Sequence, residues 1–483
     1  MAFDLNSLQP LLLSLAIALT AFALFLSRHK KLLLCHRSKK QLPPGELGFP
    51  WIGETLDFYK AQKNNKMYQQ FVQPRIQKYG KTFKTKLMGS PTVVVSGAEA
   101  NKFFLSNEFK LVVSSWPSSS VQLMGSDSIM EKQGEAHRHI RGIIATSLSN
   151  SGLESMVPKI CQTVESHFEA HWKGQDIISL YRKTRVLTFT IVLECMMGIE
   201  VKPNMLGVFE RVLEGAFSLP LNFPGSVFWR AKKARKEIEK MLLTIVRQKR
   251  EEIESQQSVG GEGGVLIFRL IMALIRDEMT EKEVVDNVVL LVFAAHDTTS
   301  FAIAMTFRML AHHPDCYSRL LQEHVEIQKN KKPGEFLALE DIKKMNYTWQ
   351  VARESMRLFP PIFGSFRKAI VDIEYDGYII PKGWKVLWTA YGTHYESEYF
   401  EDPLSFNPSR FEEPIQPYAY LPFGGGPRQC AGYQLAKLNI LILIHLVVTQ
   451  YDWSLVNPEE PILVDPLPFP SQGMPIRISP KLQ

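Results

Sequence analysis

Polar and apolar positions along the chain indicate a mainly α-helical protein with a minor β-sheet. Between residues 98 and 360 the apolar residues recur mostly at helical spacing, and residues 231–254 form one long amphipathic stretch. Strand-like alternation around glycine-containing turns occurs at 82–95 and again at 371–392. Because no internal repeat or clear boundary interrupts this pattern, we expect one large helical domain with a small sheet over residues 55–483.

The first 40 residues have a different pattern from the rest of the chain. The stretch from Leu8 to Leu26 is nearly free of charge and, at about 19 residues, is just long enough to span a bilayer as a helix. Six basic residues follow before residue 41, whereas the segment before Leu8 contains one charged side chain, that of Asp4. This charge distribution predicts a retained transmembrane anchor with the remaining chain in the cytosol. A cleaved signal peptide is the alternative, but it requires basic residues before the apolar stretch and a small-residue cleavage site after it.

Residues 41–54, "QLPPGELGFPWIGE", follow the predicted anchor and are rich in proline and glycine. Prolines fix the backbone in an extended form and glycines turn it. We therefore expect this segment to be a stiff spacer between the membrane and the catalytic domain.

Composition excludes several classes of function. The chain of 483 residues has a net charge of +7, and no basic block interleaved with aromatic residues appears beyond the N-terminus, so we expect no nucleic-acid partner. Its five cysteines include no CxxC pair, which argues against a zinc cluster or a disulfide framework and favours a reducing compartment.

One cysteine lies in unusual surroundings. Cys430 ends the run "PFGGGPRQC" and precedes an apolar helical stretch beginning near Tyr433. Free cysteines are usually buried as small hydrophobic residues, so packing does not explain a thiol at a loop tip. A loop without bulky side chains allows close approach of the backbone to something large and flat.

A second unusual segment is "LLVFAAHDTTS" at 290–300, where polar residues interrupt an apolar helical run. The apolar flanks on both sides predict an interior helix. Buried polar groups such as Asp297 and Thr298 need a partner or a function. Threonine hydroxyls can also bond back to helix carbonyls and locally open the helix.

A third motif is the pair Glu354 and Arg357 in "ESMR", on a predicted helix that stops at Pro360. The i,i+3 spacing places both side chains on one face. Such a pair, taken alone, contributes about 0.2–0.5 kcal/mol and is common on solvated surfaces.

The spacing of Phe423, Gly426, Arg428, Cys430 and Gly432 resembles the haem-ligand loop of the haem-thiolate monooxygenases, the cytochrome P-450 superfamily. The resemblance implies that the Cys430 thiolate is the axial ligand of haem b iron, where it favours O–O cleavage. It also implies that Arg428 pairs with a haem propionate, that Phe423 shields the sulfur, and that the glycines let the loop lie against the porphyrin.

The other two motifs gain roles from the same resemblance. Asp297 would relay protons and Thr298 would hydrogen-bond the bound dioxygen, although this chain has Ala295 where the family usually has glycine. Glu354 and Arg357, completed by Arg410 of "NPSRF", would form a buried network that holds the haem-loop scaffold and takes no part in the chemistry.

Three more residues match haem-propionate contacts of the family. His137 and Arg141 lie one helical turn apart in "GEAHRHIRG", and Arg367 lies in "GSFRKA". The family more often has tryptophan at the position of His137, but histidine can also donate to a carboxylate. Without the resemblance, a surface role fits each of the three equally well.

Within the superfamily, "YTWQVARESMRLFPPIFGSFRKAI" and "DGYIIPKGWKVLW" resemble the plant branch that oxidises triterpenes, taxane diterpenes and steroid-like hormones. In such enzymes an apolar substrate enters from the bilayer. By position, the resemblance implies a substrate pocket lined by Trp116, Leu123, Phe293, Ala294, Ile362, Phe363 and Phe469.

The expected function is that of a monooxygenase anchored in the endoplasmic reticulum membrane. It would insert one oxygen atom from O2 into a terpenoid skeleton, using NADPH electrons delivered by an NADPH-cytochrome reductase. One alternative is the oxidation of a steroid-like plant hormone. Others are a haem-thiolate isomerase or dehydratase that works without O2, and a haem sensor or carrier. These last two have no use for the Asp297–Thr298 pair, whose presence argues against both.

Overall fold

Helices form most of the described chain, which comprises residues 41–255, 265–332 and 334–481 of a computed structural model. The predicted transmembrane segment within residues 1–40 lies outside these residues. The α-helices in the described part are α2 (Thr55–Lys63), α3 (Gln73–Tyr79), α4 (Ala98–Ser106), α5 (Ser118–Met124), α6 (Gly134–Ser147), α7 (Asn150–His171), α8 (Leu180–Thr190), α9 (Met205–Ala216), α10 (Val227–Glu254), α11 (Leu266–Ile275), α12 (Glu281–His312), α13 (Pro314–Lys329), α14 (Leu339–Lys343), α15 (Asn346–Leu358), α16 (Tyr391–His394) and α17 (Tyr433–Gln450).

The strands are short and gather into small sheets, which confirms the predicted minor β component. The largest sheet has the order β1-β2-β8-β5-β3, in which β2 and β8 are parallel and the other pairs are antiparallel. The strands are β1 (Thr82–Leu87), β2 (Ser90–Val95), β3 (Val112–Ser114), β4 (Ile177–Ser179), β5 (Gly364–Ala369), β6 (Ile373–Tyr375), β7 (Tyr378–Ile380), β8 (Lys385–Thr389), β9 (Tyr451–Leu455), β10 (Ile462–Val464), β11 (Pro468–Pro470) and β12 (Pro475–Pro480).

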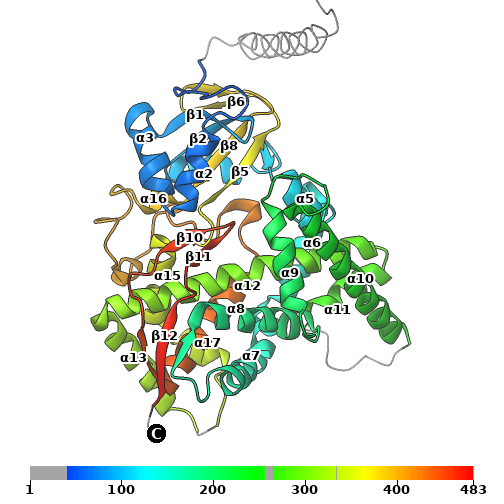
Figure 1. The fold of residues 1–483 in the computed structure, drawn as a ribbon, viewed down its shortest axis with the longest axis vertical. Coiled ribbons are helices and arrows are strands. Elements are labelled where there is room, and N and C mark those ends of the chain that lie inside the picture. The colour runs from blue at the N-terminus through cyan, green and yellow to red at the C-terminus, as the bar shows by residue number, and fades with distance from the viewer. Residues whose placement is uncertain (1–40, 256–264, 333, 482–483) are drawn as a thin grey trace, which may run out of the picture.

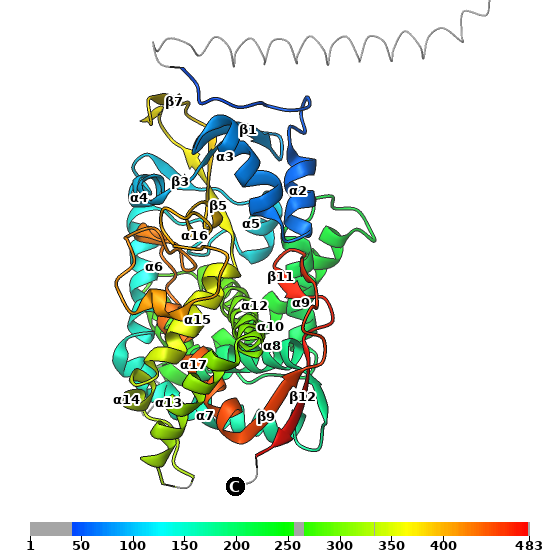
Figure 2. The same cartoon turned by 90° about the vertical axis from the view of Figure 1, so that its left-hand side faces the viewer.

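Helix α12 crosses the middle of the helical body beneath the large sheet, as Figures 1 and 2 show from two sides. It begins at a capping box, in which the Thr280 hydroxyl accepts from the Glu283 N–H and the Glu283 carboxylate accepts from the Thr280 N–H. In the described part of the chain, α12 and α17 are long and apolar enough to span a membrane, but 72% and 67% of their most apolar windows are buried in the protein. Both are therefore interior core helices here.

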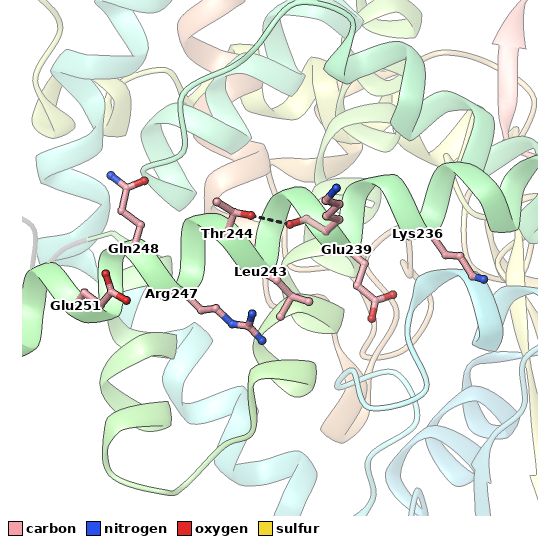
Figure 3. A pocket seen from close by; sticks show the side chains of 8 residues that line it. Lys236, Glu239, Leu243, Thr244, Arg247, Gln248 and Glu251 are labelled. Atoms are coloured by element: carbon pink, nitrogen blue, oxygen red, sulfur yellow. Dashed lines mark hydrogen bonds between the residues drawn. The ribbon is translucent and has the colours of Figure 1, made fainter.

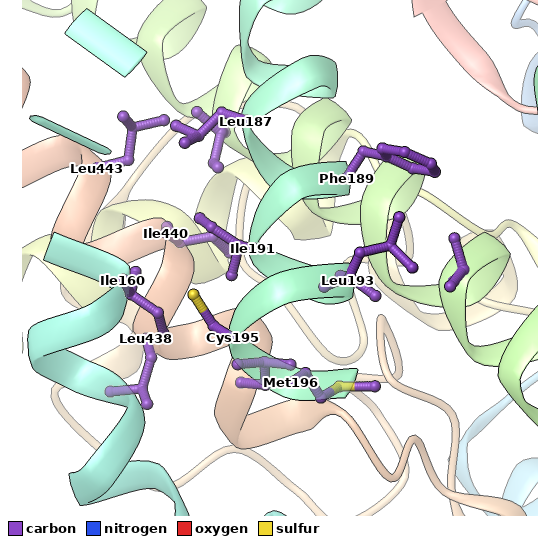
Figure 4. Packing of buried hydrophobic residues seen from close by; sticks show 14 of the residues in the cluster. Ile160, Leu187, Phe189, Ile191, Leu193, Cys195, Met196, Leu438, Ile440 and Leu443 are labelled. Atoms are coloured by element: carbon purple, nitrogen blue, oxygen red, sulfur yellow. The ribbon is translucent and has the colours of Figure 1, made fainter. Parts of the chain in front are cut away.

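The main core lies where α7, α17 and the end of α8 meet. Figure 4 shows Ile160 of α7 and Leu438 of α17 beside Cys195, which belongs to the π-helical turn Ile191–Met197 after α8. All three side chains are buried. This core packs against α17, the helix that follows Cys430.

The segment 41–54, which we expect to be a stiff spacer, makes backbone contacts with β1. The N–H of Lys84 in β1 donates to the carbonyl oxygen of Pro44 at 2.7 Å, and the N–H of Glu54 donates to that of Lys86 at 2.9 Å. Gly53 has φ +69°, and a Cβ there would lie 2.1 Å from the Lys86 oxygen. The segment therefore runs along the outer edge of β1 and is hydrogen-bonded to it at these two positions.

Candidate active site

A largely apolar cavity of about 450 Å³ lies between α12 and the loop that precedes α17. The apolar middle of α12 supplies one wall, and residues 421–425 and 428–432 supply another. Twelve of the residues selected from the sequence line this space, and they come from at least five separate elements of the fold. They are Trp116, His137, Arg141, Phe293, Ala294, Thr298, Ile362, Arg367, Phe423, Arg428, Cys430 and Gly432.

Cys430 presents its thiol to this cavity from the turn before α17. Its backbone N–H donates to the Phe423 carbonyl at 2.9 Å, which closes the loop, and the Phe423 ring packs on Tyr433 at 4.8 Å between centroids. Burial raises the pKa of the Cys430 thiol, although the Gly432 N–H and the Arg141 charge oppose this rise. A bound cation would favour the thiolate form of this sulfur, and haem iron would supply one.

Gly426 does not line the cavity, in contrast to its expected place against the haem. Its φ of +67° favours glycine, and a Cβ would lie 2.1 Å from the carbonyl oxygen of Leu105, at the end of α4. This glycine therefore allows the cysteine loop to pack against α4. By contrast, Gly424, Gly425 and Gly432 do line the cavity.

The charged residues that line the cavity are all basic. Three arginines line it, namely Arg141 of α6, Arg367 of β5 and Arg428 of the cysteine loop. His137, also of α6, has its Nδ1 buried without a hydrogen-bond partner among the described residues. Burial and the nearby arginine charges lower the pKa of His137 to about 4, so the ring is neutral near pH 7.

These residues fit haem b. The positive charge of the three arginines is offset in part by the Glu108 carboxylate, which contacts Arg367 and Arg428. The remaining net charge of about +2 matches the charge of two propionate carboxylates. The orphaned nitrogen of His137 is a further polar atom that a propionate can satisfy.

The polar pair on α12 is divided between two environments. The Thr298 side chain lines the cavity, and its hydroxyl donates to the Ala294 carbonyl at 2.7 Å, yet α12 remains continuous and does not open. Asp297 faces away from the cavity. Its carboxylate is buried and lies 2.5 Å from Nε of Arg185, which in turn pairs with Glu210 at 2.8 Å.

Glu354, Arg357 and Arg410 lie in contact, in a buried arrangement and not as a surface pair. Two nitrogens of Arg357 donate to the Glu354 carboxylate at 2.7 and 2.8 Å, and both side chains are fully buried. Nε of Arg410 donates to the same carboxylate at 3.3 Å. Arg357 also donates to the carbonyl oxygens of His394 and Pro403, each at 2.6 Å. The network therefore joins α15 to the segments that lead into the cysteine loop.

Three of the predicted substrate-pocket residues lie elsewhere. Leu123 is fully buried in the core, where its carbonyl oxygen accepts from Arg235. Phe363 packs against Phe58 of α2, and only its neighbour Ile362 lines the cavity. Phe469 of β11 packs beside the main core, and Leu467 reaches the cavity in its place.

Sequence reasoning also missed residues that line or support the cavity. Leu291 and Ala302 share the cavity-facing side of α12 with Thr298, and the helical period from Thr298 identifies that side. Glu108 carried no motif, and its position between two arginines became visible only in the structure.

A second hollow, of about 720 Å³, lies along the outside of α10. Figure 3 shows that its lining comes from one helix and is largely charged, with Lys236, Glu239, Arg247 and Glu251 at its surface. None of the residues selected from the sequence lines it. Among the described residues there is also no cluster of three or more histidine, cysteine or acidic side chains able to hold a metal ion.

Comparison with known proteins gives concordant matches. A family model described as "Cytochrome P450" matches residues 43–478. The chain is 37% identical over 478 residues to a taxane 13-alpha-hydroxylase of Taxus cuspidata, covering 97% of each chain. It is 38% identical over 452 residues to a protopanaxadiol 6-hydroxylase of Panax ginseng, covering 92% of this chain and 94% of that one. Among solved structures, a retinoic acid-bound cyanobacterial CYP120A1 superposes with a TM-score of 0.82 at 30% identity, covering 92% of this chain and all of that chain.

Proposed function

The chain belongs to the cytochrome P450 family and is a haem monooxygenase related to plant hydroxylases; from this we propose that it hydroxylates a triterpene or taxane-type diterpene skeleton. We further propose that it does so at the endoplasmic reticulum membrane, with NADPH electrons delivered by a reductase. The relatives named for taxane and protopanaxadiol hydroxylation support the substrate class, since both names denote large, mostly apolar ring systems.

The observation that carries the proposal is the chemical division of the cavity wall. Trp116, Phe293, Ala294 and Ile362 make an apolar surface near Thr298, whereas the lining arginines are confined to other elements. A rigid hydrocarbon skeleton gains free energy by leaving water for such a surface, at about 25 cal/mol per Å² of apolar area. The wall therefore favours an uncharged polycyclic substrate over a polar one.

We propose that haem b is held by Cys430 through iron and by Arg141, Arg367, Arg428 and His137 through its propionates. When bound, this group supplies the oxidising chemistry that splits O2, and a thiolate ligand promotes that step. The protein contributes the loop geometry that presents the sulfur, and it contributes the charges that neutralise the propionates.

Thr298 and Asp297 would have different roles in proton transfer. The Thr298 hydroxyl is held at the cavity wall by the Ala294 oxygen and can turn to donate to a ligand placed there. The Asp297 carboxylate is held on the opposite side of α12 by Arg185. A proton that passes between Asp297 and Thr298 has to cross the helix, either by rotation of a side chain or through water. Asp297 can therefore relay protons only after its contact with Arg185 opens.

The test is expression in microsomes with and without an NADPH-cytochrome reductase, followed by incubation with a panel of diterpene and triterpene scaffolds and of steroid-like hormones. Mass spectrometry and NMR identify the products. We expect NADPH-dependent hydroxylation of a terpenoid that is lost in Cys430→Ser. Turnover of a hydroperoxide without NADPH would instead establish an isomerase or dehydratase, and turnover confined to hormones would refute the substrate class.

The membrane location needs a separate experiment, because the anchor lies outside the described residues. Deleting residues 1–40 should release the protein from microsomes while haem content stays at the full-length level. Loss of haem on this deletion would contradict the assignment of these residues to a separate anchor.

A further inference from the structure

Glu108 is a buried carboxylate in the turn between α4 and β3. Its side chain is only 1% exposed, although glutamate is seldom fully buried unless it is paired. The turn itself is well fixed, since Asn107 Nδ2 donates to the Phe103 oxygen at 2.9 Å and the Phe109 N–H donates to the Val112 oxygen at 2.7 Å. The carboxylate therefore occupies a defined position.

Two arginines from distant parts of the chain meet at this carboxylate. Nε of Arg428 lies 2.6 Å from Oε1 of Glu108, and Nε of Arg367 lies 2.6 Å from Oε2. The N–H of Ser114 also donates to Oε1 at 2.9 Å. Because β3 pairs with β5 so that Ser114 stands opposite Arg367, the sheet register brings the carboxylate and this arginine together.

The remaining N–H groups of Arg428 are mostly used by the protein. Nη1 donates to the carbonyl oxygens of Ile129 and Met130, each at 3.1 Å, and Nη2 donates to that of Lys132 at 2.7 Å. Of its five N–H groups, these bonds and the one to Glu108 leave one free. Arg428 is therefore held in place before any ligand binds.

Arg367 is held in a similar way. Its Nη1 donates to the Ser365 hydroxyl at 2.7 Å and to the Phe366 carbonyl at 3.2 Å. Both arginines line the cavity, whereas Glu108 does not. The carboxylate thus lies behind the two guanidinium groups as seen from the cavity.

We propose that Glu108 is a positioning residue that orients Arg367 and Arg428 toward the haem propionates and adjusts the charge felt by the iron. This inference rests on the proposed placement of haem b against these two arginines. Without a carboxylate between them, two guanidinium charges in a buried wall repel each other, and each would have to be ordered as haem binds. With it, the site is preassembled.

The charge of Glu108 gives the role a measurable consequence. Burial weakens the screening of a charge by water, so a buried carboxylate near the cofactor acts on the iron more strongly than a surface one. Removing its negative charge favours the reduced, less positive iron. The reduction potential of the haem should therefore shift to more positive values in Glu108→Gln.

The experiment compares purified full-length wild type with Glu108→Gln and Glu108→Asp. The measurements are the haem reduction potential, the rate of haem transfer to excess apomyoglobin, and the carbon-monoxide difference spectrum. In Glu108→Gln we expect a positive shift in potential and a haem-transfer rate raised by about tenfold or more. In Glu108→Asp the charge stays but the shorter side chain cannot hold both contacts, so we expect faster haem transfer at a potential close to that of wild type.

Glu135→Gln is the matched control, because Glu135 is an exposed carboxylate on α6 that pairs with the exposed Arg138. It should change neither quantity. An unchanged potential in Glu108→Gln overturns the proposal, even if haem transfer is faster, because that result leaves only a packing role. If Glu108→Gln does not accumulate, a wild-type rate of haem transfer in Glu108→Asp overturns it. Absence of the thiolate-type carbon-monoxide band in wild type would refute the haem-thiolate assignment itself, which is a separate outcome.

Discussion

The backbone N–H of Leu421 donates a hydrogen bond to Nε2 of His394 at 2.9 Å. This bond fixes Nε2 as the acceptor, so the ring proton lies on Nδ1, which is 3.1 Å from the carbonyl oxygen of Arg357. His394 therefore connects the buried Glu354–Arg357 pair to the chain that enters the cysteine loop. Burial and the neighbouring Arg357 charge lower the pKa of this ring to about 3.

We predict that this histidine makes folding stability depend on pH. The pKa is about 3 in the folded protein against an ordinary value of 6.5, so below pH 6.5 the unfolded chain binds a proton that the folded chain does not. The contribution is fully present above pH 6.5 and is lost as the pH falls toward about 3. At each pH, the free energy of unfolding of the wild type is compared with that of His394→Asn. The advantage of the wild type should be about 2 kcal/mol smaller at pH 5 than at pH 7. Urea unfolding at both pH values measures this, and a difference that does not vary with pH would contradict it.

Cys430→Ser should abolish the thiolate-type carbon-monoxide difference band of the reduced protein. A serine oxygen at this position gives the iron a different ligand or none, whereas the loop closure through the Phe423 carbonyl uses the backbone and is unchanged. Cys316→Ser is the control, since Cys316 is a free cysteine on α13 outside the cavity lining, and it should keep the band. A band that survives in Cys430→Ser would mean that another residue ligates the iron.

Thr298→Ala should preserve substrate binding but divert electrons from product to peroxide. α12 presents this hydroxyl to the cavity, beside Thr299, which also lines it. Loss of a positioned proton donor commonly costs about a hundredfold in rate, so product per NADPH should fall by about tenfold or more. Thr306→Ala removes the same kind of helix-bonded hydroxyl at a buried position away from the cavity lining. It should leave the ratio unchanged. Equal coupling in Thr298→Ala and wild type would count against the role.

Arg357→Ala should destabilise the fold by about 3–5 kcal/mol, because it leaves the buried Glu354 carboxylate with only Arg410 as a charged partner, beside the hydrogen bond from the Asn407 N–H. Thermal or denaturant unfolding of the haem-loaded protein measures the loss. Lys343→Ala, which breaks an exposed pair with Glu340, should cost no more than about 1 kcal/mol. Similar losses of stability in the two variants would show that the buried network contributes no more to stability than an exposed ion pair does.

Two glycines of the cysteine loop should respond differently to alanine. Gly424 and Gly426 have nearly equal φ values, +65° and +67°, so each substitution pays a backbone cost of about 1–2 kcal/mol. A Cβ at Gly424 meets nothing within 4 Å, whereas one at Gly426 lies 2.1 Å from the Leu105 oxygen. Gly426→Ala should therefore lose clearly more stability and haem than Gly424→Ala. Equal losses would contradict the packing of this loop against α4.

Local periodicity in the sequence accounts for much of the fold and part of the site. The apolar flanks of Thr298 correctly indicated an interior helix. The cysteine loop was recognisable because its spacing is compact. Each of these features depends on residues that are close together in the chain.

The features that sequence reasoning missed depend on contacts between distant residues. Asp297 meets Arg185 across 112 positions, and Glu108 meets Arg428 across 320. Neither pair has a spacing rule, since the packing of two separate helices creates the first contact and the packing of the cysteine loop against the end of α4 creates the second. The same reason explains Gly426, whose requirement for glycine comes from Leu105 on another element.

The pairing of residues 44–54 with β1 has a consequence for solubility. β1 is the outermost strand of its sheet, and this proline-rich segment occupies the backbone groups that a lone edge would offer to another molecule. A truncation that removes the predicted membrane anchor should therefore stop before Gln41. Cutting a dozen residues further along would expose a strand edge able to recruit a second chain, and the trimmed enzyme would aggregate rather than dissolve.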